Sequence, residues 1–224
     1  MKLGEIKKIL AAAGKHGWVL EPEAKRLCRL AGMPVTRFEV ADNLDDCLRF
    51  AREIGFPLAA KIVSPDIIHK TEAGGVVTGI RNTDSLVETF ERFSALPGFT
   101  GVLLENMAEG VELIVGSKND YQFGSIVLLG IGGTGVEIYK DTVIRMAPIQ
   151  EEDAREMLSD LKGRQLLEGY RGGKIIDKGA LVEVLVRFSQ LVTEIVDFYE
   201  SIDLNPLFCS DKGCVVADAR VILK

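Results

Sequence analysis

The stretch that decides the fold is KIVSPDIIHKTEAGG, residues 61–75. It continues an almost uninterrupted apolar run that starts at residue 57, which predicts a strand buried on both faces. Lys61 is the charge within that strand, and a buried lysine is costly unless it meets an anion or a carboxylate. The polar loop that follows ends in Gly74 and Gly75, whose amides could approach a phosphate closely. We predict a triphosphate cradle reached by Lys61; the alternative is a strand-edge lysine that extends to water.

His69 lies in the same loop, beside Lys70. A lone histidine in a loop is usually a solvated side chain. The functional alternative is a nitrogen nucleophile or a proton carrier near a phosphate, because imidazole titrates near neutral pH.

A second segment of interest joins two predicted strands, residues 100–107 and 111–117. Glu105 and Met107 border the short link, and Glu112 follows it. Such a link can present backbone N–H and C=O groups to the edge of an adenine, and the nearby acid could accept hydrogen bonds from ribose hydroxyls. The alternative is that these acids are solvated turn residues.

The glycine run GIGGTG, residues 130–135, matches the dinucleotide-binding fingerprint letter by letter. That fingerprint needs a helix after it, with the helix N-terminus on the pyrophosphate. Here residues 136–146 predict a strand, so we reject the dinucleotide interpretation. A protein-kinase loop is rejected as well, because no HRD or DFG motif follows. The run is therefore expected to be a flexible flap or a structural hairpin.

Near the end of the chain, Asn205 in DLNPL and Asp218 in DAR lie on adjacent predicted strands, 202–208 and 215–223. A hairpin-like pairing could bring the two oxygen-bearing side chains together. Mg²⁺ prefers oxygen ligands, and nucleotide sites often supply one or two of them from the protein. The alternative is a plain Asn-Pro turn and a carboxylate at a strand end.

The rest of the chain alternates helices and strands. Asn43 is expected to cap a helix that Gly55 ends, and Asp84 to cap another. A break between domains is expected near residues 97–100. Helices are predicted over residues 3–13, 22–30, 44–54, 84–96, 151–161 and 178–199, a short helical segment over 164–167, and further strands over 35–40, 76–80 and 123–130.

Composition excludes several classes of protein. The 224 residues carry 27 Lys and Arg against 33 Asp and Glu, a net charge of −6, which disfavours nucleic acid as a partner. No apolar run approaches the roughly 18 residues of a membrane span, and the start has no signal-peptide core. Four cysteines without a C-x-x-C pair, and two histidines, do not supply a structural zinc site. We expect a cytoplasmic protein with buried or inert thiols.

Taken in order, these segments resemble the β subunit of ADP-forming acetyl-CoA synthetase, of the NDP-forming acyl-CoA ligase family. The resemblance covers nearly the whole chain. It implies an α+β (α/β) architecture of the ATP-grasp type, in which two α+β subdomains grip a nucleotide: a small one at 20–103, and a large one from 1–19 and 104–224. The segments are EPEAK (21–25), GMPV (32–35), KIVSPDIIHK (61–70), EAGGV (72–76), FG (123–124), GIGG (130–133), DLNPL (203–207) and DAR (218–220), with the Glu105 and Glu112 stretch between them.

The resemblance implies a role for each candidate residue. Two departures, Ser125 in place of the usual proline and the Thr134-Gly135 end of the flap, remove no charged ligand. The implied roles are phosphate binding for Lys61, Gly74 and Gly75; adenine recognition for Glu105 and Met107; ribose binding for Glu112; magnesium binding for Asn205 and Asp218; contact with the transferring phosphoryl group for Arg145; and transient phosphorylation for His69.

The resemblance also implies the reaction and the partner. A phosphohistidine carries phosphate to ADP, so that acyl-CoA, ADP and phosphate give acid, CoA and ATP. Lys61, glycine amides and Mg²⁺ would neutralise the charge that develops. A partner α subunit would carry the CoA-binding domain and the relay histidine, in an α2β2 heterotetramer. The alternatives are a succinyl- or malyl-CoA ligase β subunit, and an ATP-sensing domain without turnover.

Overall fold

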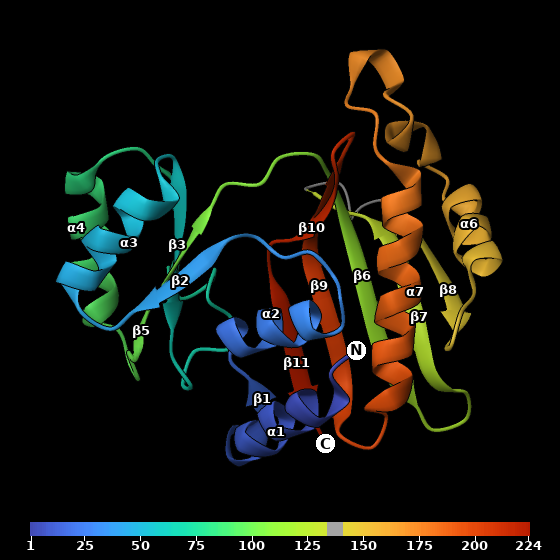
Figure 1. Cartoon of the computed structure of the whole chain (residues 1–224), viewed down its shortest axis with the longest axis horizontal. Helices are drawn as coiled ribbons and strands as arrows, with labels where there is room; N and C mark the ends of the chain where they lie inside the picture. The colour runs from blue at the N-terminus through green and yellow to red at the C-terminus, as the bar shows by residue number, and fades with distance from the viewer. Residues whose placement is uncertain (134–140) are drawn as a thin grey trace. The chain divides into compact units, whose positions relative to one another are not determined.

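The computed structural model describes residues 1–133 and 141–224 of the chain (Figure 1). Contacts within the backbone divide it into two compact units. Unit 1 comprises Met1–Val35 and Glu109–Lys224, and unit 2 comprises Thr36–Ala108. The expected small lobe began earlier, at residue 20. The boundaries differ at residues 20–35, whose helix packs on a strand from the C-terminal end of the chain within unit 1, and at residues 104–108, which fall in unit 2.

Unit 1 is built on a seven-stranded sheet of described residues, in the order β1-β11-β9-β6-β7-β8, with β10 also paired to β9. All of its named strand pairs are antiparallel. The strands are β1 (Trp18–Val19), β6 (Val111–Asp120), β7 (Gly124–Ile131), β8 (Thr142–Met146), β9 (Tyr199–Ser210), β10 (Gly213–Val216) and β11 (Ala219–Leu223).

Helices cover one face of this sheet, and α1, α2 and α7 lie on the viewer's side of it in Figure 1. Buried apolar side chains of these helices and of the strands form one continuous core. Along β9, Ile202 and Leu204 are buried, so Asp203 between them points to the opposite face. The register of β9 with β6 shifts before the next buried residue, Leu207. The helical segments are α1 (Leu3–Ala13), η1 (Gly14–His16), α2 (Glu21–Leu30), α6 (Glu151–Asp160), η2 (Arg164–Leu167), η3 (Tyr170–Gly172) and α7 (Lys178–Glu194).

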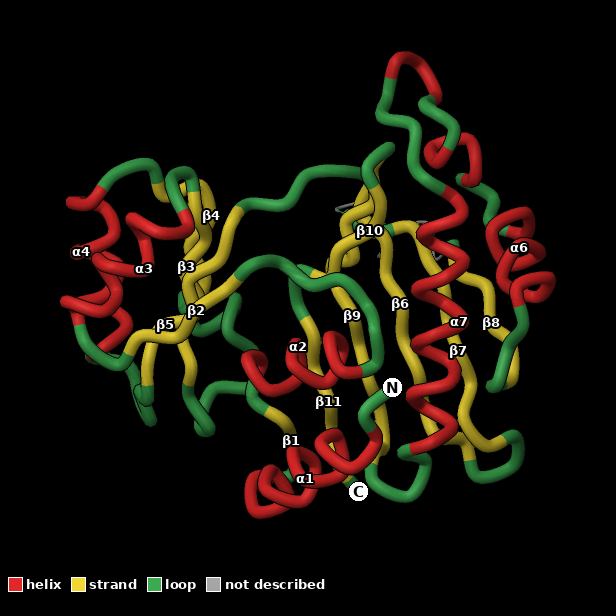
Figure 2. The backbone as a smooth tube through the Cα atoms, in the orientation of Figure 1, coloured by secondary structure: helices red, strands yellow, loops and turns green. Residues whose placement is uncertain are grey.

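Unit 2 is a four-stranded antiparallel sheet of described residues with two helices and its own apolar core. The strand order is β2-β5-β3-β4, and α3 and α4 pack together and against the sheet (Figure 2). The elements are β2 (Phe38–Ala41), α3 (Leu44–Ile54), β3 (Leu58–Val63), β4 (Val76–Ile80), α4 (Thr83–Ser94) and β5 (Gly101–Asn106). All six residues of β3 are buried, as the apolar run predicts.

Several local predictions are confirmed. The Asn43 side chain accepts a hydrogen bond from the amide of Asp46 at the start of α3. Gly55 follows the end of that helix with φ of 89°, a value that favours glycine. The predicted cap at Asp84 is wrong: Asn82 caps α4 by accepting from the amide of Ser85 at 2.9 Å.

Other predictions need correction. The predicted strand over residues 35–40 is divided at the boundary between the units: Val35 pairs with Val216, and β2 starts at Phe38. The helix predicted to reach residue 199 ends at Glu194, and Tyr199 starts β9 instead. Thr134, Gly135 and the first part of the strand predicted over 136–146 lie outside the described residues, and β8 starts at Thr142.

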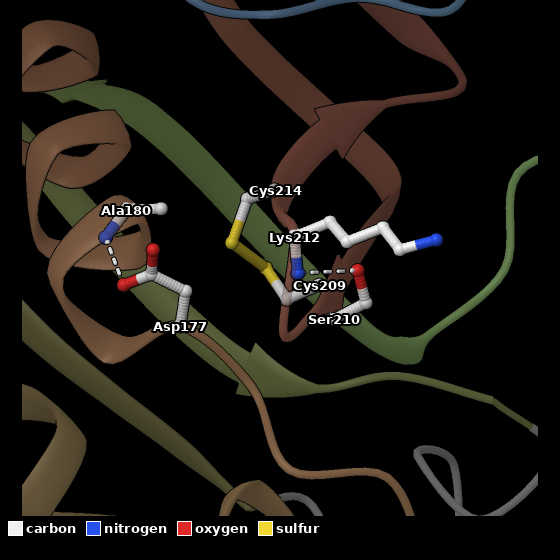
Figure 3. Close-up of a disulfide and its surroundings, with 6 residues drawn as sticks. All are labelled: Asp177, Ala180, Cys209, Ser210, Lys212 and Cys214. Atoms are coloured by element: carbon white, nitrogen blue, oxygen red, sulfur yellow. Dashed lines mark hydrogen bonds between the residues drawn. A yellow bond between two sulfur atoms is a disulfide. The ribbon is translucent and has the colours of Figure 1, made fainter.

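The four cysteines do not all remain thiols. Cys209 and Cys214 form a disulfide across β9 and β10, as Figure 3 shows. Cys28 and Cys47 are free and buried, as expected. Burial raises the pKa of Cys28 to about 12 and that of Cys47 to about 11. The expectation of inert thiols is therefore correct for one pair and wrong for the other.

Candidate functional site

Lys61 is buried in β3, with 6% of its surface exposed. Its ammonium lies 2.9 Å from a carboxylate oxygen of Glu105, which is itself only 3% exposed. In the strand register Lys61 opposes Leu103 and Glu105 opposes Ala59, so the two side chains are diagonal neighbours on one face of the sheet. The carboxylate also accepts a short hydrogen bond from the Thr36 hydroxyl. The buried lysine thus has the carboxylate partner that its position in the strand requires.

Thr36 and the pairing role of Glu105 were missed in the sequence. Glu105 was predicted next to an adenine, whereas its side chain forms an ion pair with Lys61 within unit 2. The sequence nevertheless contains a signal for this ion pair. Two adjacent antiparallel strands, each with one charge of opposite sign in an otherwise apolar run, favour pairing of those charges.

The loop between β3 and β4 is shaped by its two glycines. Gly74 has φ of 67°, a value in the left-handed region. A Cβ atom on Gly75 would lie 2.5 Å from Cγ2 of Ile62, so residue 75 must be small. The amide of Gly74 donates to the carbonyl of Thr71 at 3.1 Å, and that of Gly75 to the carbonyl of Lys70 at 2.7 Å. The glycines therefore fold the loop with the same amides that were predicted to reach a phosphate.

His69 lies in this loop with its side chain 62% exposed. Its Nδ1 is 3.9 Å from a carboxylate oxygen of Glu72, and its carbonyl accepts from the amide of Ala73 at 3.2 Å. The backbone is thus held in place, whereas the imidazole is open to solvent. This arrangement leaves the ring accessible to an incoming group.

The link after β5 is held on both sides by the side chain of Asn106. Its oxygen accepts from the amide of Arg37 at 2.7 Å, and its nitrogen donates to the carbonyl of Met107 at 3.1 Å. Met107 is 37% exposed. Further along, Lys174 donates to Glu109 at 2.9 Å and holds the pKa of that carboxyl below its usual value.

The face of the unit 1 sheet that points away from its core carries three predicted residues. Glu112 on β6 is exposed and opposes Phe208 of β9. Asn205 of β9 is exposed, and its amide donates to the carbonyl of Asp218 at 3.2 Å. Leu204 and Ala219 are paired and buried, and Asn205 follows Leu204 in β9. Asp218 lies opposite Asn205, immediately before β11 and outside the strand predicted to run over 215–223, because that strand is divided into β10 and β11. The hairpin-like pairing predicted for these residues is confirmed.

An ion pair on the same face was not predicted. Arg220 contacts a carboxylate oxygen of Asp203 at 3.1 Å, and the two residues oppose each other in β11 and β9. Both residues lie within the DLNPL and DAR segments, so the alternation of strand residues could have revealed the pair.

Arg145 lies on β8, and acidic side chains of α6 hold its guanidinium. Its Nη2 is 2.6 Å from Asp160 and 3.8 Å from Glu156. The side chain is 32% exposed. A role at a phosphoryl group would require the guanidinium to leave these carboxylates or to share its donors with them.

Ser125 has a clear structural role. Its hydroxyl accepts a hydrogen bond from the buried Tyr199 hydroxyl at 2.8 Å and donates to the carbonyl of Val192. Tyr199 also shares a hydrogen bond of 2.8 Å with Ser117. Ser125 thus takes part in a buried polar network.

The donor set of Asn205 and Asp218 fits Mg²⁺. An amide oxygen and a carboxylate oxygen are the hard ligands that this ion prefers, and nucleotide sites often complete its octahedron with phosphate oxygens and water. Among the described residues there is no group of three or more His, Cys, Asp or Glu side chains that could hold a metal alone. These residues therefore suit a metal shared with a ligand better than a closed protein cage.

The two units, each a sheet with helices and a polar strand face or loop, define an ATP-grasp domain. The chain matches the model of that family over residues 10–223, and nucleotide binding is the property that this family name denotes. In the part of the chain that the structure describes, no helix has both the length and the apolar character needed to span a bilayer.

Comparison with known proteins identifies a smaller group within the ATP-grasp family. The chain is 41% identical, over 92% of its length and 91% of the relative, to the β subunit of ADP-forming acetate–CoA ligase I from Pyrococcus furiosus. It matches the solved acetyl-coenzyme A synthetase 1 of Candidatus Korarchaeum cryptofilum, in complex with coenzyme A and Ca-AMPCP, at 36% identity and a TM-score of 0.91, over 97% of this chain and 99% of that one.

A second structure of the same synthetase contains coenzyme A and Mg-AMPPCP, and its phosphohistidine segment points towards the nucleotide-binding site. It matches with 35% identity and a TM-score of 0.86, over 98% of this chain and 100% of that one. The chain belongs to the ATP-grasp β subunits of the ADP-forming acetate–CoA ligase family, which are ligases.

Proposed function

We propose that this chain transfers a phosphoryl group between ADP or ATP and a phosphohistidine on a partner α subunit. The net reaction is acyl-CoA + ADP + phosphate = acid + CoA + ATP. The observation that carries the proposal is the backbone hydrogen bond that places Asn205 of β9 beside Asp218, just before β11, in a chain that also buries Lys61 in β3. The likeness to a structure that holds a Mg²⁺ nucleotide and a phosphohistidine segment supports it.

Each residue has a distinct task in this proposal. Lys61 binds phosphate oxygens, since its ammonium carries a positive charge and three donors. Glu112 accepts from the ribose, and the backbone near Glu105 and Met107 contacts the adenine. Gly74 and Gly75 shape the loop that carries His69. Asn205 and Asp218 hold Mg²⁺, which neutralises polyphosphate charge when bound.

His69 and Arg145 act on the transferring group. An exposed imidazole can attack the γ-phosphorus of ATP through its nitrogen lone pair, so that the N–P bond forms as the bond to ADP breaks and the ring loses a proton. Arg145 would stabilise the phosphoryl charge after exchanging a carboxylate of α6 for a phosphate oxygen. The α subunit supplies the CoA site and the relay histidine in an α2β2 assembly. The cytoplasmic location stays a prediction.

The test is coexpression with the α subunit, followed by an assay of acyl-CoA-dependent ATP synthesis with several acids. Robust turnover with acetyl-CoA supports the acetate–CoA ligase assignment. Turnover with succinyl- or malyl-CoA alone would instead support the second candidate. ATP binding without turnover with any acyl-CoA would indicate a sensing domain.

Two variants separate the roles. Asp218→Asn should raise the Mg²⁺ concentration needed for half-maximal rate, and Asp197→Asn, an exposed carboxylate elsewhere in unit 1, is the matched control. His69→Ala should lower kcat more than ADP affinity, with His16→Ala as the control at the other histidine. An unaltered magnesium titration would remove Asp218 from the metal site, and an unaltered kcat would make His69 a bystander.

A further inference from the structure

The hairpin of β9 and β10 is closed by a two-residue turn, Asp211-Lys212, because Gly213 opposes Ser210. That register places Cys214 directly opposite Cys209, and the two form the disulfide of Figure 3. Both cysteines are buried, at 0% and 4% exposure. The turn residues Asp211 and Lys212 are exposed.

The first connection from unit 1 to unit 2 leaves from this hairpin. The amide of Val216, in β10, donates to the carbonyl of Pro34 at 2.9 Å. Val35 pairs with Val216 in a parallel bridge, and unit 2 begins at the next residue, Thr36. The last residues of unit 1 before the crossing are thus fixed to β10, two positions beyond Cys214.

The return connection reaches the other strand of the same hairpin. Val111, the first residue of β6, opposes Cys209 in the register. A Cβ atom on Gly110 would lie 2.3 Å from the carbonyl oxygen of Cys209, so the chain packs against the half-cystine itself. Both crossings are therefore anchored within two residues of the disulfide.

The same strands carry the candidate nucleotide and metal residues. Glu112 opposes Phe208, one residue from Cys209. The amide of Ala217 donates to the carbonyl of Pro206 at 3.0 Å, next to the bond between Asn205 and Asp218. A change in the spacing of β9 and β10 would be passed to these residues through the ladder.

We propose that the Cys209–Cys214 disulfide positions the nucleotide and metal residues of unit 1, and that its reduction by a dithiol weakens their binding. The step breaks the sulfur–sulfur bond. The dithiol supplies two electrons and two protons, leaves as its own disulfide, and the two cysteines become thiols. This inference rests on the proposed function, because it concerns affinity for ADP and Mg²⁺.

The disulfide acts by limiting how β9 and β10 can separate. A covalent link at directly opposed positions restrains the ladder on both sides of it. Without the link, the hydrogen bonds that remain near the turn can open locally. Because the sulfur atoms are buried beneath an exposed turn, reduction should follow opening of the turn.

The experiment compares the full chain, with its partner subunit, before and after treatment with dithiothreitol. The loss expected on reduction is about 10-fold in Mg²⁺ affinity, the lower end for removing support from a metal ligand. KM for ADP should rise while kcat changes less. Amide hydrogen exchange at Val216 and Val111 should become faster, a readout that needs no nucleotide.

The double variant Cys209→Ser/Cys214→Ser is the matched control. It should resemble the reduced protein and should not respond to dithiothreitol, although Cys28 and Cys47 are retained. If that variant does not fold, the comparison of the oxidised and reduced wild-type protein is sufficient to test the proposal.

Equal KM, Mg²⁺ affinity and exchange rates in the oxidised and reduced protein would overturn the proposal. Absence of ADP binding in both states, with faster exchange at Val216 and Val111 after reduction, would overturn the proposed function and leave the hairpin anchor standing. Faster exchange with unchanged ADP and Mg²⁺ binding would confine the disulfide to a structural role, and so refute the positioning role.

Discussion

Replacement of Lys61 by methionine tests whether the ion pair with Glu105 supports unit 2. Both side chains are almost fully buried, and their charged atoms are 2.9 Å apart. The substitution removes the Lys61 ammonium from a buried carboxylate that keeps the hydrogen bond from the Thr36 hydroxyl. Removal of one member of a buried pair costs about 3–5 kcal/mol. We expect a loss of that order in the free energy of unfolding of unit 2.

The double variant Lys61→Met/Glu105→Gln provides the control. Glutamine keeps an acceptor for Thr36 and removes the uncompensated charge, so a large part of the lost stability should return. The two variants therefore distinguish an electrostatic cost from a packing cost, since both carry methionine at residue 61.

The sequence supplies a way to assign the transition to one unit. The single tryptophan, Trp18, lies in unit 1, and residues 36–108 contain no tryptophan or tyrosine. In urea, far-UV circular dichroism should show early unfolding of unit 2 in Lys61→Met, while Trp18 fluorescence keeps its midpoint. An unchanged dichroism transition, or a double variant as unstable as the single one, would refute the reasoning.

Two further predictions concern packing and ionisation. Gly75→Ala should lower stability by about 1–3 kcal/mol, as overpacking does, because its Cβ would meet Ile62 at 2.5 Å; an unchanged urea midpoint would show that the loop yields. Burial raises the pKa of Cys28 to about 12 from 9.0, so the native thiol should resist iodoacetamide at pH 8. Because the thiol of the unfolded chain ionises at lower pH than the native one, the contribution of Cys28 to the free energy of unfolding is complete below pH 9 and is lost as pH rises towards 12. Rapid alkylation of Cys28 in the native protein would contradict its burial.

Local signals in the sequence predict much of the fold. The apolar run ending at Val63 predicts β3, and Asn43 and Gly55 mark the two ends of α3. Each of these signals depends on the chain near it, through burial on both faces or through a hydrogen bond three residues away. Such local signals therefore predict the same element whatever the rest of the chain does.

Predictions from the sequence are wrong where contacts between residues far apart in the chain determine the structure. The helix predicted to reach Tyr199 ends at Glu194, and Tyr199 starts β9, where its hydroxyl forms hydrogen bonds with Ser117 and Ser125, 82 and 74 positions away. The disulfide is not predicted from the sequence, because the register of a hairpin, and not a C-x-x-C spacing, brings Cys209 and Cys214 together. For the site, Asn205 and Asp218 were predictable from hairpin pairing, whereas the partner of Lys61 required the alignment of β3 with β5.

The Lys61–Glu105 pair has a consequence for nucleotide binding. The carboxylate of Glu105 offsets the positive charge that Lys61 could present to a polyphosphate. On the proposed function, neutralisation must then come largely from Mg²⁺ at Asn205 and Asp218. Glu105→Gln removes the cancelling charge and keeps the acceptor for Thr36. It should therefore raise ADP affinity in the absence of Mg²⁺, by calorimetry on protein shown to be folded. If, in the absence of Mg²⁺, the Glu105→Gln variant binds ADP no more tightly than the wild type does, Lys61 does not face the phosphates.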